Sequence, residues 1–97
     1  MNTIKFSHKA NEQLSELEGN PSKKAAYKAI FKCLGYMKTN LRHNSLQTHK
    51  FTSKKGPKGE KIFESYAQQE TPGAHRIFWY YGPGRMELTI SAIIPHP

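Results

Sequence analysis

Residues 74–94 read AHRIFWYYGPGRMELTISAII, and this stretch decides the fold. Its first part, Ala74 to Tyr81, is rich in the aromatic and β-branched residues that favour strands. Gly82-Pro83-Gly84 is typical of a tight turn, and Met86 to Ile94 again has the composition of a strand. The stretch therefore predicts an antiparallel hairpin. In its second strand the alternating positions are expected to share one face: Leu88, Ile90, Ala92 and Ile94.

The segments before this hairpin differ from one another in composition. Lys61 to Gln68 predicts another strand, which Thr71-Pro72-Gly73 separates from the hairpin. Leu41 to Glu60 is polar and basic, contains Gly56-Pro57 and has no sustained periodicity. It predicts a long loop, in which only a short strand around Leu46 to Phe51 could form.

The N-terminal part predicts one strand and two helices. Thr3 to Phe6 alternates like a strand, and Ser7 can cap a helix that runs to Gly19. Asn20-Pro21 begins a second helix that fades near residues 38–40. The sequence therefore predicts a single domain, 1–97, of the α+β class. We expect an N-terminal strand and a two-helix antiparallel hairpin packed on an antiparallel sheet of about four strands.

Charge is the most informative property of the composition. The 97 residues include 15 Lys and Arg and seven Glu but no Asp, which gives a formal net charge of +8. Between Lys23 and Lys61 the only acidic residue is Glu60. Such a field points to a polyanionic partner, which could be nucleic acid, an anionic membrane surface or an acidic protein. The alternative is a surface that serves only solubility.

Several classes of protein and site are disfavoured by what the sequence lacks. No run approaches the roughly 20 apolar residues of a membrane span, and residues 1–10 lack the apolar segment of a secretory signal. Cys33 is the single cysteine, which favours the reducing cytoplasm. The five His have no metal-ligand spacing, and no catalytic triad or phosphate-binding loop is visible. We expect no metal and no cofactor.

What remains is a basic and aromatic surface. In the strand from His75 to Tyr81, Ile77 and Trp79 point to one face and Arg76 to the other. With Ile77 and Trp79 against the helices, Arg76 stands on the open face. There it either pairs with Glu64 of the neighbouring strand or binds a phosphate.

Other candidates are weighed in the same way. The lysines of the preceding loop are either a solvated charge run or an anion-binding group: Lys50, Lys54, Lys55 and Lys58. Tyr80 could stack on a base, although packing within the sheet is the commoner role. His96 is either a frayed terminal residue or a general acid or base.

The element order, the basic second helix and the segment Ala74 to Tyr81 resemble the RelE/ParE superfamily of bacterial toxins from toxin–antitoxin systems. The strand 88–94 with its tail Pro95-His96-Pro97 is similar to the family's C-terminal strand, and Leu46 with His49 resembles the start of an earlier strand. The resemblance covers nearly the whole chain. It implies a ribosome-dependent, metal-free endoribonuclease of messenger RNA in the RelE-like branch and an inhibitor of DNA gyrase in the ParE-like branch. It also implies an antitoxin, usually acidic, as partner.

Carried over residue by residue, the resemblance implies that Arg76 binds the scissile phosphate. Lys54, Lys55 and Lys58 fall where the family has basic residues of a catalytic loop; they would supply charge, with Lys54 a candidate for the base, and His96 would be a candidate acid. The resemblance leaves the identity of the general base open. The residues implied to contact RNA are Lys50, Lys55, Lys58, Arg85 and Tyr80. Two departures stand out, because Pro97 replaces the terminal tyrosine of many active ribonucleases and His43-Asn44 offers no carboxylate base. The alternatives are therefore a ParE-like gyrase inhibitor and a non-catalytic member that binds RNA or a protein.

Overall fold

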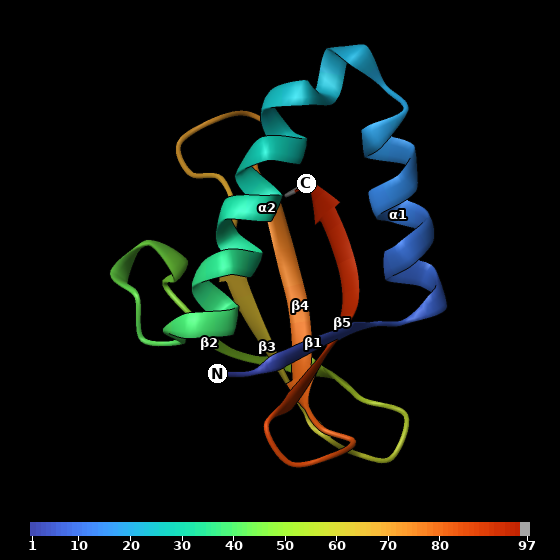
Figure 1. The fold of residues 1–97 in the computed structure, drawn as a ribbon, viewed down its shortest axis with the longest axis vertical. Coiled ribbons are helices and arrows are strands. Elements are labelled where there is room, and N and C mark those ends of the chain that lie inside the picture. Colours follow the sequence, from blue (N-terminus) through green and yellow to red (C-terminus); the bar gives the residue numbers. More distant parts are fainter. Residues whose placement is uncertain (96–97) are drawn as a thin grey trace.

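The computed structural model describes residues 1–95, in which two helices cover one face of a five-stranded sheet (Figure 1). The helices are α1 (His8–Glu18) and α2 (Lys24–Thr39). The strands are β1 (Thr3–Phe6), β2 (His49–Lys55), β3 (Lys61–Tyr66), β4 (His75–Tyr81) and β5 (Glu87–Pro95). No helix among the described residues has the length and apolar character needed to cross a membrane. The predicted α+β class is confirmed, and the second face of the sheet is left open.

Local capping explains where the helices begin. The Oγ of Ser7 accepts a hydrogen bond from the amide of Ala10 at 3.1 Å and so caps α1 as predicted. Asn20 caps a single 3-10 turn, Pro21–Lys23, which leads into α2. The second helix therefore starts one turn later than Asn20-Pro21 indicated. Gly19 ends α1 with a right-handed φ of −80°, so its left-handed freedom is not used.

The sheet is mixed, with the strand order β1-β5-β4-β3-β2. β1 pairs with β5 in parallel, and the other neighbours are antiparallel. The expectation of an antiparallel sheet of about four strands was therefore short by one strand. The additional strand is β2, which takes up seven residues of the segment 41–60 and extends beyond the short strand that could form around Leu46 to Phe51. Its composition hid it, because an edge strand paired on one side tolerates a polar, lysine-rich sequence.

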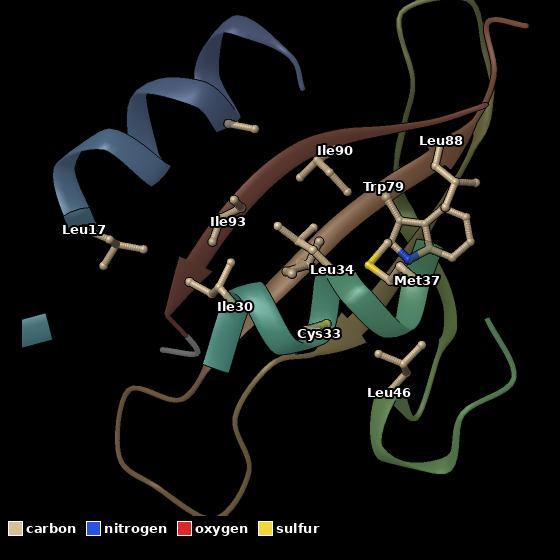
Figure 2. Packing of buried hydrophobic residues seen from close by; sticks show 12 residues of the cluster. Leu17, Ile30, Cys33, Leu34, Met37, Leu46, Trp79, Leu88, Ile90 and Ile93 are labelled. Atoms are coloured by element: carbon tan, nitrogen blue, oxygen red, sulfur yellow. The ribbon is translucent and has the colours of Figure 1, made fainter. Parts of the chain in front are cut away.

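The core lies between the helices and the sheet (Figure 2). Ile30 and Met37 of α2 are fully buried over Ile77 and Trp79 of β4. The indole Nε1 of Trp79 donates to the Oγ of Ser65 at 2.9 Å, so the one polar atom of this ring is satisfied. The predicted orientation of Ile77 and Trp79 toward the helices is thus confirmed, and it directs Arg76 to the open face.

A β-bulge in β5 changes which residues face the core. Phe78 pairs with Ala92 but Trp79 pairs with Ile90, so Ser91 is the extra residue. Beyond the bulge Ile93 is buried with the core residues, while Ala92 and Ile94 line a groove on the open face. The predicted common face of Leu88, Ile90, Ala92 and Ile94 is therefore wrong after Ile90.

Candidate active site on the open face of the sheet

Three charged or titratable side chains meet on the open face. Nη1 of Arg76 in β4 donates to Oε2 of Glu64 in β3 at 3.0 Å. The other carboxylate oxygen, Oε1, lies 2.7 Å from Nε2 of His49 in β2. The register explains the meeting, because His49 stands opposite Glu64 and Glu64 stands opposite Phe78, two residues from Arg76. We call Arg76, Glu64 and His49 the charged cluster.

Hydrogen bonding fixes the protons of His49. Its Nδ1 lies 2.9 Å from the carbonyl oxygen of Gln47, which can only accept, so Nδ1 carries a proton. Nε2 faces a carboxylate oxygen of Glu64, and an ionised carboxylate also only accepts. Arg76 holds the other oxygen of Glu64, and both contacts of the His49 ring are satisfied when both of its nitrogens carry a proton. In that form the cluster carries a net charge of +1 (two cations and one anion), and both ring N–H groups of His49 contact acceptors of the chain.

Arg76 is held from two sides. Its guanidinium carbon lies 3.8 Å from the centre of the Tyr66 ring, a cation–π contact, in addition to the pair with Glu64. Its side chain is only 15% exposed, and Nε is buried with no hydrogen-bond partner among the described residues. The structure thus realises the predicted pair with Glu64, and it places Arg76 in a fixed orientation at the surface of the sheet.

A groove with an apolar floor and a lysine rim continues from the cluster. Phe51 and Phe78 meet edge to face at a centroid distance of 4.8 Å, and they stand two residues along their strands from His49 and Arg76. The groove encloses about 230 Å³. The basic residues that line it are Lys9, Lys54 and Lys55. Lys54 and Lys55 therefore belong to the same face as the cluster, although they lie on β2 rather than in the predicted loop.

The other two predicted lysines lie apart from this groove. Lys50 stands opposite Phe63 in the register of β2 and β3, and Phe63 packs against the core on the helical side. Since alternate residues of a strand point to opposite faces, Lys50 faces away from the cluster. Lys58 is exposed in the β2–β3 turn, where its amide donates to Oε1 of Glu60 at 2.7 Å.

The remaining candidates are also dispersed. Tyr80 shares the face of Arg76 but is 9% exposed, so its ring is covered by the fold. Arg85 is exposed in the turn that follows the far end of β4. His96 lies outside the described residues. The structure brings Arg76, Lys54 and Lys55 to one face, whereas Lys50, Lys58 and Arg85, which were also predicted to contact RNA, lie elsewhere.

Sequence reasoning missed His49 and Tyr66 as members of the site. The available signal was the alternation of His49 and Phe51, which places both on one face once residues 49–55 form a strand. Glu64 was foreseen only as a partner for Arg76, and its second contact depends on the pairing of β2. Within residues 1–95 no group of three or more His, Cys, Asp or Glu is placed to hold a metal ion.

The molecule is thus defined as a helical hairpin on a five-stranded mixed sheet whose open face carries a charged cluster. Three solved structures share this architecture at low identity. The YoeB dimer from Staphylococcus aureus is 19% identical with a TM-score of 0.65, and the match covers 99% of this chain and 98% of that chain. The archaeal RelE–RelB complex from Pyrococcus horikoshii OT3 is 12% identical with a TM-score of 0.66, and the match covers 97% of this chain and 93% of that chain. The YoeB/ParE toxin from Agrobacterium tumefaciens is 10% identical with a TM-score of 0.70, and the match covers the full length of both chains.

These structures show that the chain has the RelE/ParE-type toxin fold, so the resemblance seen in the sequence is confirmed for the fold. No family model matches the sequence, and no curated protein matches it. At such identities function has to be argued from the site itself.

Proposed function

We propose that this chain is the toxin of a toxin–antitoxin pair and a metal-independent endoribonuclease that cuts messenger RNA on the ribosome. The observation that carries the proposal is the charged cluster on the open face, beside a lysine-rimmed groove, in a fold that YoeB and RelE proteins share. A cationic group in fixed orientation next to a protonated imidazole suits phosphate chemistry.

The proposed reaction uses the RNA's own 2′-hydroxyl. Its oxygen bonds to the adjacent phosphorus while the bond from phosphorus to the 5′-oxygen breaks, which leaves a 2′,3′-cyclic phosphate and a 5′-hydroxyl. Arg76 holds the non-bridging oxygens, and Lys54 accepts the 2′-hydroxyl proton as a neutral amine and so carries positive charge once the proton is transferred. The leaving 5′-oxygen takes the Nε2 proton of the His49 imidazolium, which gives up its contact with Oε1 of Glu64 in this step. One proton is thus accepted by Lys54 and one is supplied by His49. Each acid–base step contributes about 10²–10⁴-fold.

Glu64 has a positioning role in this scheme. It contacts both Arg76 and His49, and it holds the two cationic groups at a fixed separation. Without a carboxylate between them the two groups would repel one another. The scheme assigns the acid to His49 in place of the earlier candidate His96, because His49 has a defined partner on the same face.

The proposal includes a partner and a location. The Pyrococcus horikoshii structure is a RelE–RelB complex, and a chain with a net charge of +8 suits an acidic antitoxin. Messenger RNA on the ribosome is the proposed target, and the cytoplasm is the proposed place of action. In the proposal Lys54 keeps its predicted catalytic role and Lys55 its predicted contact with RNA, since both lysines line the groove.

The test is induced expression in a bacterium, with the translation rate and the 5′-ends of messenger RNA followed over minutes. We expect rapid arrest of translation with new cuts inside coding sequences. Arg76→Ala and His49→Ala should abolish the cuts, whereas Arg42→Ala, an exposed arginine outside the cluster, should not. Circular dichroism must show that each variant is folded. Full cutting by folded Arg76→Ala would overturn the assignment.

A second candidate function is inhibition of DNA gyrase, as expected for the ParE-like branch. The observation in its favour is that Nη1 of Arg76 already donates a hydrogen bond to Glu64. A protein that does not act on RNA would show the same ion pair. Growth arrest with a DNA-damage response and intact messages would select this function. Absence of both effects would leave a member that only binds RNA or a protein.

A further inference from the structure

The groove beside the charged cluster has an apolar floor, which phosphate binding alone does not require. The groove encloses about 230 Å³, and its floor consists of four apolar side chains: Phe51, Ile62, Phe78 and Ile94. This volume is below the roughly 300–1,000 Å³ of sites that bind drug-sized ligands. Phe78 follows Arg76 by two residues in β4, which is about 7 Å along the strand. One planar ring attached close to a phosphate therefore suits both the floor and the cluster.

The β-bulge in β5 places a polar side chain at the edge of this floor. Ser91 is the extra residue of the bulge, and it lines the groove together with Ala92, which stands opposite Phe78. The Oγ of Ser91 donates its proton to the carbonyl oxygen of Phe78 at 3.1 Å, and this carbonyl can only accept. A hydroxyl has no second proton, so Ser91 can serve a ligand in the groove only as a hydrogen-bond acceptor. Bulges next to active sites commonly redirect a side chain in this way.

A hydrogen-bond donor stands beside this acceptor. Lys9 of α1 also lines the groove, is exposed and forms no ion pair with a described residue. The Oγ of Ser7 donates to the carbonyl oxygen of Ser91 at 3.0 Å, which holds the start of α1 next to the bulge. Among the described residues that line the groove, Ser91 is the one with an uncharged polar side chain. The β5 side of the groove therefore offers one acceptor and one ammonium donor at the edge of an apolar floor.

We propose that this groove is a nucleobase subsite that selects adenine, and that Ser91 and Lys9 determine the selection. Adenine presents an amino donor next to a ring-nitrogen acceptor, and this pattern matches an acceptor next to a donor. Guanine presents two acceptors on the same edge, so its carbonyl oxygen would face the Ser91 oxygen with no proton between them. A purine also covers more of the floor than a pyrimidine, and burial of that area is favourable. The inference rests on the proposed function, since the base belongs to a nucleotide next to the phosphate on Arg76.

The rim of the groove orients such a nucleotide. Lys54 and Lys55 lie on the β2 side of the groove, whereas Ser91 and Lys9 lie on the β5 side. In the strand order β5-β4-β3-β2 these two sides are three strand spacings apart, about 14 Å. The ribose and phosphate take the side of the two β2 lysines, and the base extends over Phe78 with its far edge toward β5.

Other occupants leave part of the groove unmatched. Inorganic phosphate would use the lysines but leave the apolar floor uncovered. An apolar side chain of a peptide would cover the floor, but it brings no donor for Ser91 and no negative charge for the lysines, and buried polar groups without partners are costly. A base with its phosphate uses the floor, the acceptor and the cations together.

Mononucleotides test the subsite without the ribosome and without cleavage, because they contain no internucleotide bond. Isothermal titration calorimetry compares adenosine 5′-monophosphate (AMP) with inosine 5′-monophosphate (IMP), in which a carbonyl oxygen replaces the amino group of the base. Ribose 5-phosphate is the probe without a base. We expect AMP to bind about tenfold more tightly than IMP, equivalent to about 1.4 kcal/mol. Ribose 5-phosphate should bind more weakly than either nucleotide.

Variants then locate the selection on the β5 side. Ser91→Ala should bring the affinities for AMP and IMP close together, and Ser91→Thr, which keeps the hydroxyl, should preserve the difference. Lys9→Met changes an exposed side chain and should weaken both nucleotides while leaving ribose 5-phosphate unchanged. Ala92→Leu should fill the space over the floor and reduce AMP binding to that of ribose 5-phosphate. The matched controls are Ser15→Ala and Lys28→Met, at exposed helical positions outside the groove, and both should bind as the unchanged chain does.

Several results would overturn the proposal. The unchanged chain could bind IMP as tightly as AMP, or AMP no more tightly than ribose 5-phosphate. An unchanged preference for AMP in folded Ser91→Ala would show that another residue reads the base.

The cuts in messenger RNA separate this inference from the proposed function. Selective AMP binding by a chain that makes no cuts would support the subsite and overturn the ribonuclease. Cuts without adenine at a fixed neighbouring position would support the ribonuclease and overturn the subsite.

Discussion

Removal of the Glu64 side chain should destabilise the protein more than removal of its partner Arg76. Glu64 touches two cationic groups, Nη1 of Arg76 at 3.0 Å and Nε2 of His49 at 2.7 Å. In Glu64→Ala both cations remain without their anion. In Arg76→Ala the carboxylate keeps His49, so no charge is left alone.

The expected magnitudes follow from burial. Loss of one partner of a buried ion pair costs about 3–5 kcal/mol of stability. The side chains of Arg76 and Glu64 are 15% and 10% exposed, so we expect a slightly smaller cost for this pair. We expect Glu64→Ala to lower the free energy of unfolding by about 2–4 kcal/mol, which is a fall in Tm of roughly 10–20 °C for a domain of this size. Arg76→Ala loses one charge-assisted hydrogen bond and the stacking on Tyr66, about 1–2 kcal/mol.

The assay is urea unfolding followed by circular dichroism for both single variants and the double variant at one pH and salt concentration. Because Arg76 is no longer an unpaired cation when both side chains are removed, the double variant should lose less stability than the sum of the two singles. The coupling should lie within the roughly 0.5–3 kcal/mol seen for residues in contact. Additive effects, or a larger loss for Arg76→Ala than for Glu64→Ala, would refute the reasoning.

Three further predictions concern buried polar groups. Ser65→Ala should cost about 1–3 kcal/mol in urea unfolding and change the fluorescence of Trp79, because the indole N–H loses its acceptor. Burial raises the pKa of the Cys33 thiol to about 12 from an ordinary value of 9.0. The unfolded thiol ionises first, so stability should fall as pH rises above about 9, and Cys33→Ala should reduce that dependence. Burial, and then the charge of Lys23, lower the pKa of His75. The contribution of neutral His75 to the free energy of unfolding should be complete above about pH 6.5 and lost at lower pH. His75→Gln should reduce this loss of stability at acid pH, and His8→Gln, at an exposed position, should not.

The strands and helices with a clear hydrophobic period could be predicted from the sequence. The strand that carries Ile77 and Trp79 was found because its apolar residues alternate and its turns contain Gly and Pro. β2 was foreseen only as a possible short strand around Leu46 to Phe51, because an edge strand needs few apolar residues and the polar run His49–Lys55 has no sustained periodicity. The bulge at Ser91 was also invisible, since both Ile93 and Ile94 are apolar and only pairing with β4 decides between them.

Two members of the charged cluster were foreseen, Arg76 and its partner Glu64, and the third was not, for the same reason. Arg76 lies on a predictable strand, so its face follows from Ile77 and Trp79. His49 belongs to the strand whose extent and pairing were not predicted, and its contact with Glu64 is long-range in sequence. A site assembled from three strands can be predicted only when all three strands and their registers are known.

The pair with Glu64 and the binding of a phosphate, which the sequence presents as alternatives for Arg76, are compatible in the structure. A guanidinium has five N–H donors in a planar fork. Nη1 contacts Glu64, the ring of Tyr66 covers one face, and Nε is buried. The Arg76 side chain is 15% exposed, and the part of the fork that reaches solvent is already oriented, so an incoming anion need not immobilise a flexible side chain. The carboxylate that satisfies Arg76 also holds the His49 imidazolium beside it, so the cluster keeps the net positive charge that a phosphate requires.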